Sequence, residues 1–385
     1  MTIGIPKEIM KDERRVSATP ETVKKMTADG HEVLVETRAG EGAFFSDAAY
    51  SEAGAQIIND AAEIYSRSEV ILKVKEPQFN AAKNIHETDM MKSGQYIISF
   101  LHPAAPDNHE MVRKLAAKGI IGLTLDGIPR ISRAQNMDAL TSMSTCAGYK
   151  GILMAANDLA KFAPQIFCAV GMIKPINALV IGAGVGGLQA IATLKRLGAV
   201  IYAADIRPAA VEHVKSLGAK VVDIGVPEEY AVGNGGYALG LSDEWLKKVH
   251  AALKDVVAAS DIIFLSALVP GKKAPILITE EMVKSMKPGS VIIDISIDQG
   301  GNCEITPPGA IEVKHGVTIN GIKNLPGLLP ESATFMFANN IYNLFKYLTK
   351  DGEIKLDLND EIVGGILTTY EGKVVHAGTL EAMGE

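Results

Sequence analysis

Short apolar runs alternate with amphipathic stretches over the first third of the chain. The apolar runs predict strands at residues 2–6, 31–36, 70–74, 96–101 and 120–125. The amphipathic stretches predict helices at residues 20–30, 46–53 and 108–118. Because strands that alternate with helices build parallel sheets with helices on both faces, this part of the chain predicts an α/β domain.

A second series of the same kind follows a long helical stretch at residues 139–162. Its strands are predicted at residues 178–181, 200–203, 220–223, 261–265, 290–295 and 317–319. A helix at residues 332–348 and a polar tail come last, and we expect this helix to return to the first domain. The fold class predicted is therefore α/β, with two Rossmann-like doubly wound domains and mainly parallel sheets: a discontinuous N-terminal domain of residues 1–140 plus 327–385, and a second domain of residues 141–326.

Residues 225–245, GVPEEYAVGNGGYALGLSDEW, interrupt the second series with glycines, an acidic pair and two tyrosines. Loops of this length are uncommon inside compact domains and are usually lids, binding loops or disordered segments. Composition alone leaves both a mobile functional loop and a plain surface insertion open.

Length and charge narrow the class of protein. A chain of 385 residues favours two domains of roughly 150 to 200 residues each. Hydrophobic residues at 47 % and charged residues at 22 % are typical of a globular protein. A net charge of −7 without a lysine- or arginine-rich run argues against a nucleic-acid-binding protein.

The cysteines indicate the compartment. Cys146, Cys168 and Cys303 are odd in number and widely spaced, so they support neither a disulfide framework nor a zinc site, and we expect no bound metal. The N-terminus, MTIGIPKEIMKDERR, carries charges where a secretory signal would need an apolar region. We therefore expect a protein of the reducing cytosol.

One segment has the length of a membrane span. Residues 175–194 contain no charged side chain over 20 positions, which is enough to cross a bilayer. However, β-branched residues followed by a glycine cluster and a small-residue helix are typical of a buried parallel strand that turns into its helix. We therefore expect no direct insertion into a membrane.

The glycine cluster in this segment is a G-x-G-x-x-G motif, from Gly182 to Gly187, between a predicted strand and a predicted helix. The first glycine permits a tight turn, Gly184 lets the backbone approach a pyrophosphate, and Gly187 lets helix and strand pack closely. The start of the helix supplies amide donors and partial positive charge. In this context the motif predicts a dinucleotide-binding site.

Asp205 follows the next predicted strand, 18 residues beyond Gly187. A carboxylate at this place accepts hydrogen bonds from the adenosine ribose and repels a 2′-phosphate, so NAD(H) is favoured over NADP(H). Arg207, two residues on, would soften that preference. The alternative is a solvated acid at a strand end.

Three polar residues of the first domain lie near predicted strand ends, where open α/β sheets bind ligands: Arg15, Lys75 and His102. Singly, each is more simply explained as a surface charge or a packed histidine. Together with Asp298 of the second domain they would suit an α-keto acid, because the cations bind carboxylate and carbonyl while the imidazole or the acid handles protons.

The segment PRISRAQNMD, residues 129–138, places two arginines, a glutamine and an aspartate between two apolar segments. With IGIPKE, ERRVSATP, LKVKEP, LVPGKKAP and GGNCE it makes the chain recognisable over almost its whole length. The sequence resembles the NAD(H)-binding alpha subunits (domain I) of proton-translocating transhydrogenases and, more distantly, the alanine dehydrogenases of the same superfamily. PRISRAQNMD and the insertion with Gly235 to Ala238 resemble the transhydrogenases and are not expected in alanine dehydrogenases.

The resemblance implies roles for particular residues. Arg130, Asp138 and Thr141 would hold the nicotinamide carboxamide and the nearby ribose, and Gln135 would orient the dihydronicotinamide toward the acceptor. Thr141 stands where a serine is common in the family but keeps the hydroxyl. The residues expected to contact NAD(H) in the second domain are Gly182, Gly184, Val185, Gly187, Asp205, Ile206, Arg207, Tyr237, Ala267 and Leu268.

The implied activity is hydride transfer from NADH to NADP⁺ bound on a partner subunit. Such a step depends mostly on positioning, because no proton has to leave or arrive at the reacting carbon. The resemblance also implies membrane and NADP(H)-binding subunits as separate polypeptides, a peripheral place at the inner membrane through those subunits, and a homodimer.

Two other functions stay open at this point. One is a free-standing NAD-dependent alanine dehydrogenase, which makes L-alanine from pyruvate, ammonia and NADH at Arg15, Lys75, His102 and Asp298, because these residues resemble the pyruvate-handling set of that enzyme. The other is a non-catalytic NAD-binding module that signals occupancy to a partner.

Overall fold

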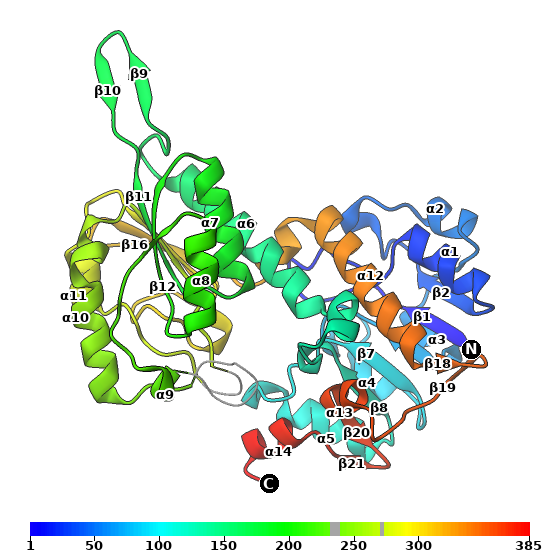
Figure 1. Ribbon diagram of the computed structural model, residues 1–385. Helices are drawn as coiled ribbons and strands as arrows, with labels where there is room; N and C mark the ends of the chain where they lie inside the picture. The colour runs from blue at the N-terminus through cyan, green and yellow to red at the C-terminus, as the bar shows by residue number, and fades with distance from the viewer. Residues whose placement is uncertain (232–238, 270–272) are drawn as a thin grey trace. The chain divides into compact units, whose positions relative to one another are not determined.

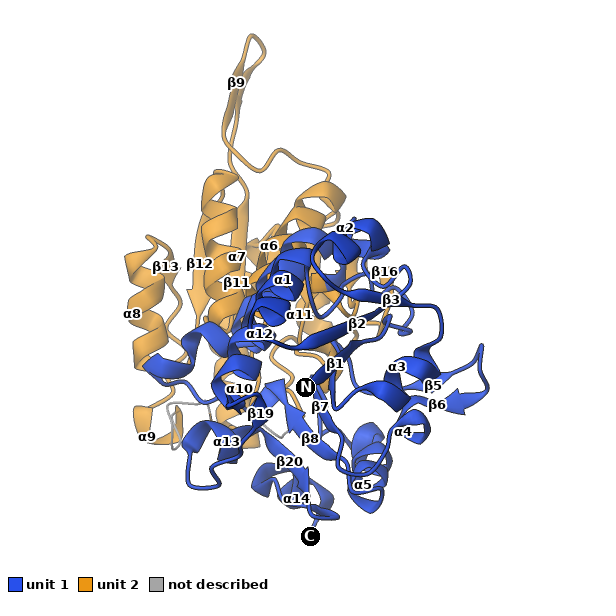
Figure 2. Ribbon diagram, turned by 90° about the vertical axis from the view of Figure 1, so that its right-hand side faces the viewer, with its two compact units in different colours: residues 1–143, 327–385 blue, residues 144–326 orange. Residues whose placement is uncertain are grey.

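Two compact units make up the chain, as a computed structural model that describes residues 1–231, 239–269 and 273–385 shows (Figures 1 and 2). Unit 1 consists of Met1–Met143 and Gly327–Glu385, and unit 2 of Ser144–Pro326. The long helix α6 (Ala139–Asp158) begins in unit 1 and ends in unit 2.

Every residue of unit 1 is described, and its main sheet has eight strands in the order β21-β20-β8-β7-β4-β1-β2-β3. The strands are β1 (Thr2–Ile5), β2 (Glu32–Glu36), β3 (Gln56–Ile58), β4 (Val70–Leu72), β7 (Tyr96–Ser99), β8 (Ile121–Thr124), β20 (Leu367–Tyr370) and β21 (Lys373–Val374). The pairs from β8 to β3 are parallel, whereas β20 pairs antiparallel with both β8 and β21. The C-terminal segment thus completes a sheet that the N-terminal segment begins.

The helices of unit 1 start at residues that cap their first amides. Thr19 and Thr22 form a reciprocal capping box at the start of α1 (Pro20–Ala28), and the Asp60 carboxylate accepts a hydrogen bond from the amide of Ala62 in α3 (Ala61–Arg67). The unit also holds the short hairpins β5 (Phe79–Asn80) with β6 (Ile85–His86) and β18 (Thr349–Lys350) with β19 (Glu353–Ile354). Its helices are α1 (Pro20–Ala28), α2 (Asp47–Glu52), α3 (Ala61–Arg67), α4 (Glu87–Met90), α5 (His109–Ala117), α12 (Pro330–Leu348), α13 (Glu361–Ile366) and α14 (Ala377–Met383).

The described part of unit 2 contains a seven-stranded sheet in the order β13-β12-β11-β14-β15-β17-β16. Its strands are β11 (Asn177–Ile181), β12 (Val200–Ala204), β13 (Lys220–Val221), β14 (Ile262–Leu265), β15 (Val291–Asp294), β16 (Ile311–Lys314) and β17 (Val317–Asn320). All neighbours are parallel except β16 and β17. The helices beside it are α7 (Val185–Arg196), α8 (Pro208–Ser216), α9 (Glu228–Ala231), α10 (Asp243–Ala259) and α11 (Glu280–Lys284).

Successive residues of β11 enter two different hydrophobic cores. Ala178 and Val180 belong to the core on one face of the sheet, whereas Leu179 and Ile181 belong to the core on the other face. Since side chains alternate along a strand, a strand buried on both faces needs a continuous apolar sequence. This arrangement confirms the predicted α/β, doubly wound fold class. It also confirms that residues 175–194 form a strand and the start of a helix. No helix in the described part of the chain is long and apolar enough to cross a membrane.

Several elements differ from the sequence prediction. The tail is not merely polar, because it supplies β20 and β21, and the hairpin of β9 (Ile166–Cys168) and β10 (Gly171–Ile173) was not predicted. Residues 225–245 are not one loop throughout: α9 and the first turn of α10 lie inside this range. The Ser242 hydroxyl accepts a hydrogen bond from the amide of Trp245, which is the capping interaction that starts α10.

A cluster of buried charges gathers around Lys73, directly after β4 of the unit 1 sheet. The buried ammonium of Lys73 lies 2.9 Å from the Glu87 carboxylate and 3.4 Å from that of Glu8, and the Tyr65 hydroxyl donates to Glu87 over 2.8 Å. The amide of Val74 donates to the other Glu8 oxygen over 2.6 Å. Burial, which outweighs the attraction of Lys73, raises the pKa of Glu8 to about 7.

This pKa predicts a pH-dependent stability. Between pH 4.5, the ordinary pKa of the group, and about 7, folded Glu8 keeps its proton while the unfolded chain loses it. The folded state then binds more protons, so the contribution of Glu8 to the free energy of unfolding is full below this window and falls by about 3 kcal/mol as pH rises through it. We expect Glu8→Gln to remove this decline, measured by urea unfolding at pH 5, 6, 7 and 8.

The control for this experiment is Glu21→Gln, which removes an exposed carboxylate of α1. The Glu21 variant should keep the pH profile of the unsubstituted protein. If Glu8→Gln and the unsubstituted protein lost stability in parallel between pH 5 and 8, Glu8 would not be the group responsible.

Candidate functional site

The turn from β11 into α7 brings backbone against backbone. Gly182 has φ +89°, and a Cβ there would lie 2.7 Å from the amide nitrogen of Ala267. A Cβ on Gly187 would lie 1.9 Å from the carbonyl oxygen of Gly182. Both glycines are therefore required by the turn itself, because any side chain would force the strand and the helix apart.

Gly184 differs from these two glycines. A Cβ on Gly184 would meet no atom within 4 Å, so the fold does not require glycine here. The residue is the N-cap of α7 and has no side chain that would accept hydrogen bonds from the first amides of the helix. The open space in front of Gly184 thus lies at the first amide groups of α7 and at the positive end of the helix dipole. This arrangement stabilises a bound phosphate. Val185, the first residue of α7, follows at the same turn.

The helix α6 fixes α7 from behind. A Cβ on Gly148 of α6 would lie 2.2 Å from the carbonyl oxygen of Gly186, so the two helices touch through their backbones. Gly151, one turn later, faces Phe264 and Ile293 of the sheet. Sequence reasoning did not find Gly148; the glycines at 148 and 151 in an otherwise helical stretch were the available signal.

Asp205 follows β12 and is buried, with a side chain that is 4 % exposed, so it is not a solvated acid at a strand end. One carboxylate oxygen accepts from the amide of Ala183 over 2.7 Å, which ties Asp205 to the glycine turn. The guanidinium of Arg207 donates to both carboxylate oxygens, over 2.9 and 2.8 Å, and the amide of Arg207 donates over 2.8 Å.

A pocket of about 500 Å³ opens beside Asp205. Its walls are the start of α8 and residues 221–226, and Ile206, Val222 and Ile224 make its surface partly apolar. Pockets of this size, apolar with a few polar groups, are typical of small-molecule sites. Asp205, predicted to bind the adenosine ribose, and Ile206, predicted to contact NAD(H), thus lie at the same pocket.

Ala267 and Leu268 follow β14, at the strand end next to the glycine turn. The buried side chain of Asn302 accepts from the amide of Ala267 over 2.9 Å and donates to its carbonyl oxygen over 2.8 Å. Asp294 accepts in turn from the amide of Asn302 over 2.8 Å. Sequence reasoning noted the GGNCE motif but assigned it no role; the structure shows that its asparagine fixes the segment beside Gly182.

The segment PRISRAQNMD of unit 1 forms the 3-10 helix η4 (Ser132–Met137), and its apolar residues Ala134 and Met137 are buried. The backbone oxygen of Asn136 accepts from the side-chain Nδ2 groups of Asn340 and Asn343 in α12, over 2.9 and 3.1 Å. These contacts hold the segment against α12.

Arg133 provides a second anchor for this segment. It donates to Asp360 over 2.9 Å and to the Tyr347 hydroxyl over 2.8 Å. Although burial opposes the shift, hydrogen bonds from Tyr347, Arg133 and the amide of Ile362 hold the pKa of Asp360 at about 2, so the anchor is charged at neutral pH.

The four residues predicted to hold the nicotinamide differ in their surroundings. The Asp138 carboxylate accepts hydrogen bonds from the amide of Thr141 over 2.8 Å and from its hydroxyl over 2.7 Å, so Asp138 caps the start of α6. Arg130 and Gln135 are exposed, and among the described residues the Gln135 side chain has no hydrogen-bond partner. Gln135 is thus an available amide on a fixed support. Tyr237 lies outside the described residues.

His102 and Asp126 form a pair at the carboxyl ends of β7 and β8. His102 has φ +44°, its Nδ1 lies 2.7 Å from one Asp126 oxygen, and its amide donates to the other over 2.8 Å. Burial acts to lower the pKa of His102, but the charge and hydrogen bond of Asp126 outweigh it and raise that pKa. Asp126 was not found from the sequence, because only the fold brings it to His102.

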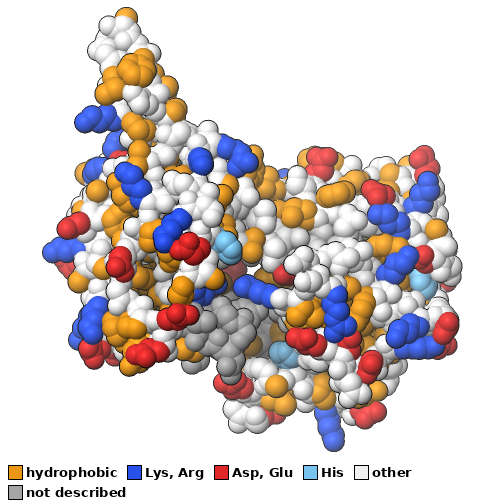
Figure 3. Space-filling model, in the orientation of Figure 1, with side chains coloured by type: hydrophobic (Ala, Val, Ile, Leu, Met, Phe, Trp, Pro, Cys, Tyr) orange, Lys and Arg blue, Asp and Glu red, His pale blue; other side chains and the backbone are white. Residues whose placement is uncertain are grey.

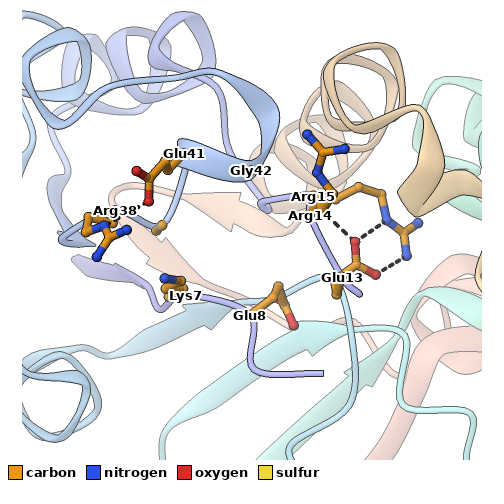
Figure 4. Close-up of a pocket in the computed structure, with 9 residues that line it drawn as sticks. Lys7, Glu8, Glu13, Arg14, Arg15, Arg38, Glu41 and Gly42 are labelled. Carbon is orange, nitrogen blue, oxygen red and sulfur yellow. Dashed lines mark hydrogen bonds and ion pairs between the residues drawn. The ribbon is translucent and has the colours of Figure 1, made fainter. Parts of the chain in front are cut away.

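Arg15 lies beside a small polar pocket of about 220 Å³ that Lys7, Arg14 and Arg38 also line (Figure 4). Its guanidinium makes a two-point contact with Glu13, and both side chains are almost fully buried. Burial acts to raise the pKa of Glu13, but the hydrogen bonds and charge of Arg15, with a smaller contribution from the charge of Lys75, lower it. The charge of Lys75 also reaches His102, where it opposes the net rise of the pKa. Arg15, Lys75 and His102 therefore share one region of unit 1.

Asp298 belongs to unit 2, where it is exposed in η6 (Ile297–Gln299) and lies 3.6 Å from the ammonium of Lys323. Its predicted convergence with the three residues of unit 1 stays a prediction. Within the described ranges, no group of three or more histidine, cysteine or acidic side chains is arranged to bind a metal ion.

Comparison with known proteins places both units in one family. The model of the alanine dehydrogenase/PNT N-terminal domain matches residues 4–147, and that of the C-terminal domain matches residues 151–377. An NAD(P) transhydrogenase alpha subunit polypeptide of Rhodospirillum rubrum is 43 % identical over 380 residues, 98 % of each chain. Alanine dehydrogenase of Bacillus subtilis is 31 % identical over 394 residues, 100 % of this chain and 95 % of the relative.

The solved structures agree. A transhydrogenase from Sinorhizobium meliloti superposes with a TM-score of 0.82 at 35 % identity, covering 98 % of this chain and 99 % of the other. An L-alanine dehydrogenase reaches 0.81 at 28 % identity, covering 100 % and 99 %. Since family models match nearly the whole length, the chain belongs to the alanine dehydrogenase/PNT family.

Proposed function

We propose that this chain is the NAD(H)-binding subunit of a transhydrogenase and passes hydride from NADH to NADP⁺ held by a partner subunit. The observation that carries the proposal is the turn at Gly184, which leaves space and amide donors for a pyrophosphate beside the pocket of Asp205. Identity of 43 % to a transhydrogenase alpha subunit, against 31 % to an alanine dehydrogenase, favours this activity within the family.

In this proposal NAD(H) supplies the hydride, and the residues of this chain bind and orient. The amides at the start of α7 bind the pyrophosphate, and Asp205 binds the adenosine ribose. Arg130, Asp138 and Thr141 hold the carboxamide and the nearby ribose, and Gln135 orients the ring. A support that is already fixed saves the ordering entropy that a flexible segment would lose in each encounter, which is how positioning lowers a barrier.

The name "subunit alpha" of the relatives implies further subunits in their complexes. We propose that this chain likewise works with an NADP(H)-binding subunit and a membrane subunit, and that it meets the membrane through them.

We also propose that the chain forms a homodimer through the β9–β10 hairpin, which projects from unit 2 (Figures 1 and 3). Between Gln165 and Lys174 the hairpin has no charged residue, and Phe167, Val170 and Met172 are 75 %, 96 % and 51 % exposed. An isolated two-stranded hairpin is barely stable in water, and permanent homodimer interfaces are the most apolar class, so a second copy is the occupant that fits.

One observation favours a second activity, the reductive amination of pyruvate. The His102–Asp126 pair holds an oriented imidazole, and the charge and hydrogen bond of Asp126 raise its pKa against the effect of burial, which suits an acid–base step on a keto acid. The contact of Arg15 with Glu13 argues against it, because binding a substrate carboxylate would require that guanidinium to exchange partners.

The two glycines of the turn provide a test of NAD(H) binding. We expect Gly184→Ala to weaken NADH binding about tenfold or more while stability changes by less than about 0.5 kcal/mol, since the Cβ enters open space needed by the pyrophosphate. The matched variant Gly187→Ala should lose about 3 kcal/mol of stability, because its Cβ strikes the Gly182 carbonyl. Calorimetric titration and urea unfolding measure both; unchanged NADH affinity in Gly184→Ala would exclude this turn as the site.

Gln135 provides the test of hydride transfer. With the NADP(H)-binding subunit of the complex added, we expect Gln135→Asn to slow transfer from NADH to an NADP⁺ analogue by roughly 10- to 100-fold with unchanged NADH affinity, because the shorter amide misplaces the ring. Stopped-flow absorbance measures the rate, and the neighbouring Asn136→Ala is the control.

Two results would contradict the transhydrogenase assignment. NADH oxidation by pyruvate and ammonia without a partner, abolished by Arg15→Ala or Lys75→Ala, would make the chain an alanine dehydrogenase. Tight NADH binding with neither activity would leave a non-catalytic binding module.

The hairpin provides the test of the homodimer. In sedimentation velocity we expect the unsubstituted chain to be a dimer and the double variant Phe167→Asp, Val170→Asp to be a folded monomer, because charge disfavours an apolar interface. Leu358→Asp, which places the same charge at an exposed leucine of unit 1, should remain a dimer. A monomeric unsubstituted chain, or a dimeric hairpin variant, would refute this interface.

A further inference from the structure

The carboxylate of Asp205 has a full set of hydrogen-bond donors. Two carboxylate oxygens offer about four acceptor positions. The structure supplies four donors, all within 2.9 Å: the amides of Ala183 and Arg207, and the Nε and Nη2 groups of the Arg207 guanidinium. A ligand hydroxyl can therefore bind Asp205 only by replacing one of these donors.

The four donors are of two kinds. The amides of Ala183 and Arg207 belong to the backbone of the glycine turn and of the loop after β12, so they stay in place whatever binds. The other two belong to one flexible side chain that is 18 % exposed, next to Ile206 and Pro208 of the pocket wall. The guanidinium can leave Asp205 without disturbing the backbone, because the backbone amide of Arg207 makes its own, separate hydrogen bond to Asp205.

The departing pair of donors matches what a ribose offers. The guanidinium presents two N–H groups, one to each carboxylate oxygen, as a fork. The 2′- and 3′-hydroxyls of a ribose are likewise two adjacent donors. The two hydroxyls can therefore replace the two guanidinium N–H groups, and the number of hydrogen bonds that the carboxylate accepts stays the same.

We propose that the Arg207 guanidinium occupies the ribose-diol position on Asp205 and is displaced when NAD(H) binds, so that Arg207 is a specificity-determining residue acting as an internal competitor. This inference rests on the proposed NAD(H) binding. It makes the affinity of the site for NADH lower than Asp205 alone would give, which favours release of the oxidised product.

The displaced guanidinium also affects discrimination between coenzymes. Asp205 without a counter-charge repels a 2′-phosphate, whereas an arginine turned outward beside it attracts one. Removing Arg207 should therefore strengthen binding of NADH and weaken binding of NADPH. The two effects have opposite signs, which a general loss of structure would not produce.

The experiment is calorimetric titration of the full chain and its Arg207→Ala variant with NADH, NADPH, ADP and 2′-deoxy-ADP. We expect Arg207→Ala to bind NADH about tenfold more tightly and NADPH more weakly, in line with the worth of hydrogen bonds to a charged group. Loss of the 2′-hydroxyl from ADP should lower the affinity about twofold in the unsubstituted chain and about tenfold in the variant. Arg196→Ala, which removes an exposed arginine of α7 from the same unit, should leave all four affinities unchanged.

Equal or weaker NADH binding by a folded Arg207→Ala variant would overturn the inference. If Arg207→Ala does not fold, Arg207→Gln takes its place with the same expectations, since glutamine is neutral and cannot form the fork. If the unsubstituted chain binds neither NADH nor ADP, the proposed NAD(H) binding itself fails, and this is a different result from binding that Arg207 does not affect.

Discussion

The contact of backbone with backbone at the start of α7 is the constraint on which unit 2 depends. Gly187 lies against the carbonyl of Gly182, and Gly148 of α6 lies against the carbonyl of Gly186 on the same helix. Because peptide groups replace side chains at these contacts, α7 has little freedom to shift along either neighbour. The first amides of α7 and the amide of Ala183, which donates to Asp205, are consequently held at fixed positions before any ligand arrives.

Much of the fold followed from the sequence because it is encoded locally. The apolar runs of β11 and β14 and the glycines between β11 and α7 are short-range patterns with a direct structural reading. The strands β20 and β21 were missed because their sequence is only partly apolar and because they pair with β8, about two-thirds of the chain away. The β9–β10 hairpin was missed because its apolar side chains are largely exposed. Partners of this kind cannot be read from a window of neighbouring residues.

The candidate site likewise combines residues that the sequence predicted with residues that it did not. Asp205 and the glycines were found because they stand at fixed spacings, whereas their supports are joined only in the fold: Asn302 reaches Ala267 over 35 positions, and Asn340 reaches Asn136 over 204. The sequence also predicted Asp205 as an acceptor but gave no count of its donors. That count changes its role from an open carboxylate to one already engaged.

Two sets of candidate residues in unit 1 present their chemistry differently, and this bears on which reaction we propose for the chain. The pairs His102–Asp126 and Arg15–Glu13 are closed arrangements in which a basic side chain already contacts an acidic one. Gln135 is the opposite case: its side chain is a neutral, exposed amide, and its segment is held by the buried Ala134 and Met137 and by the contact of Arg133 with Asp360. A hydride donor needs a neutral orienting group more than an acid or base, since the ring must face its acceptor while no proton moves. Gln135 is firmly supported, and its side chain has no hydrogen-bond partner among the described residues, which is why we propose it as the group that orients the ring.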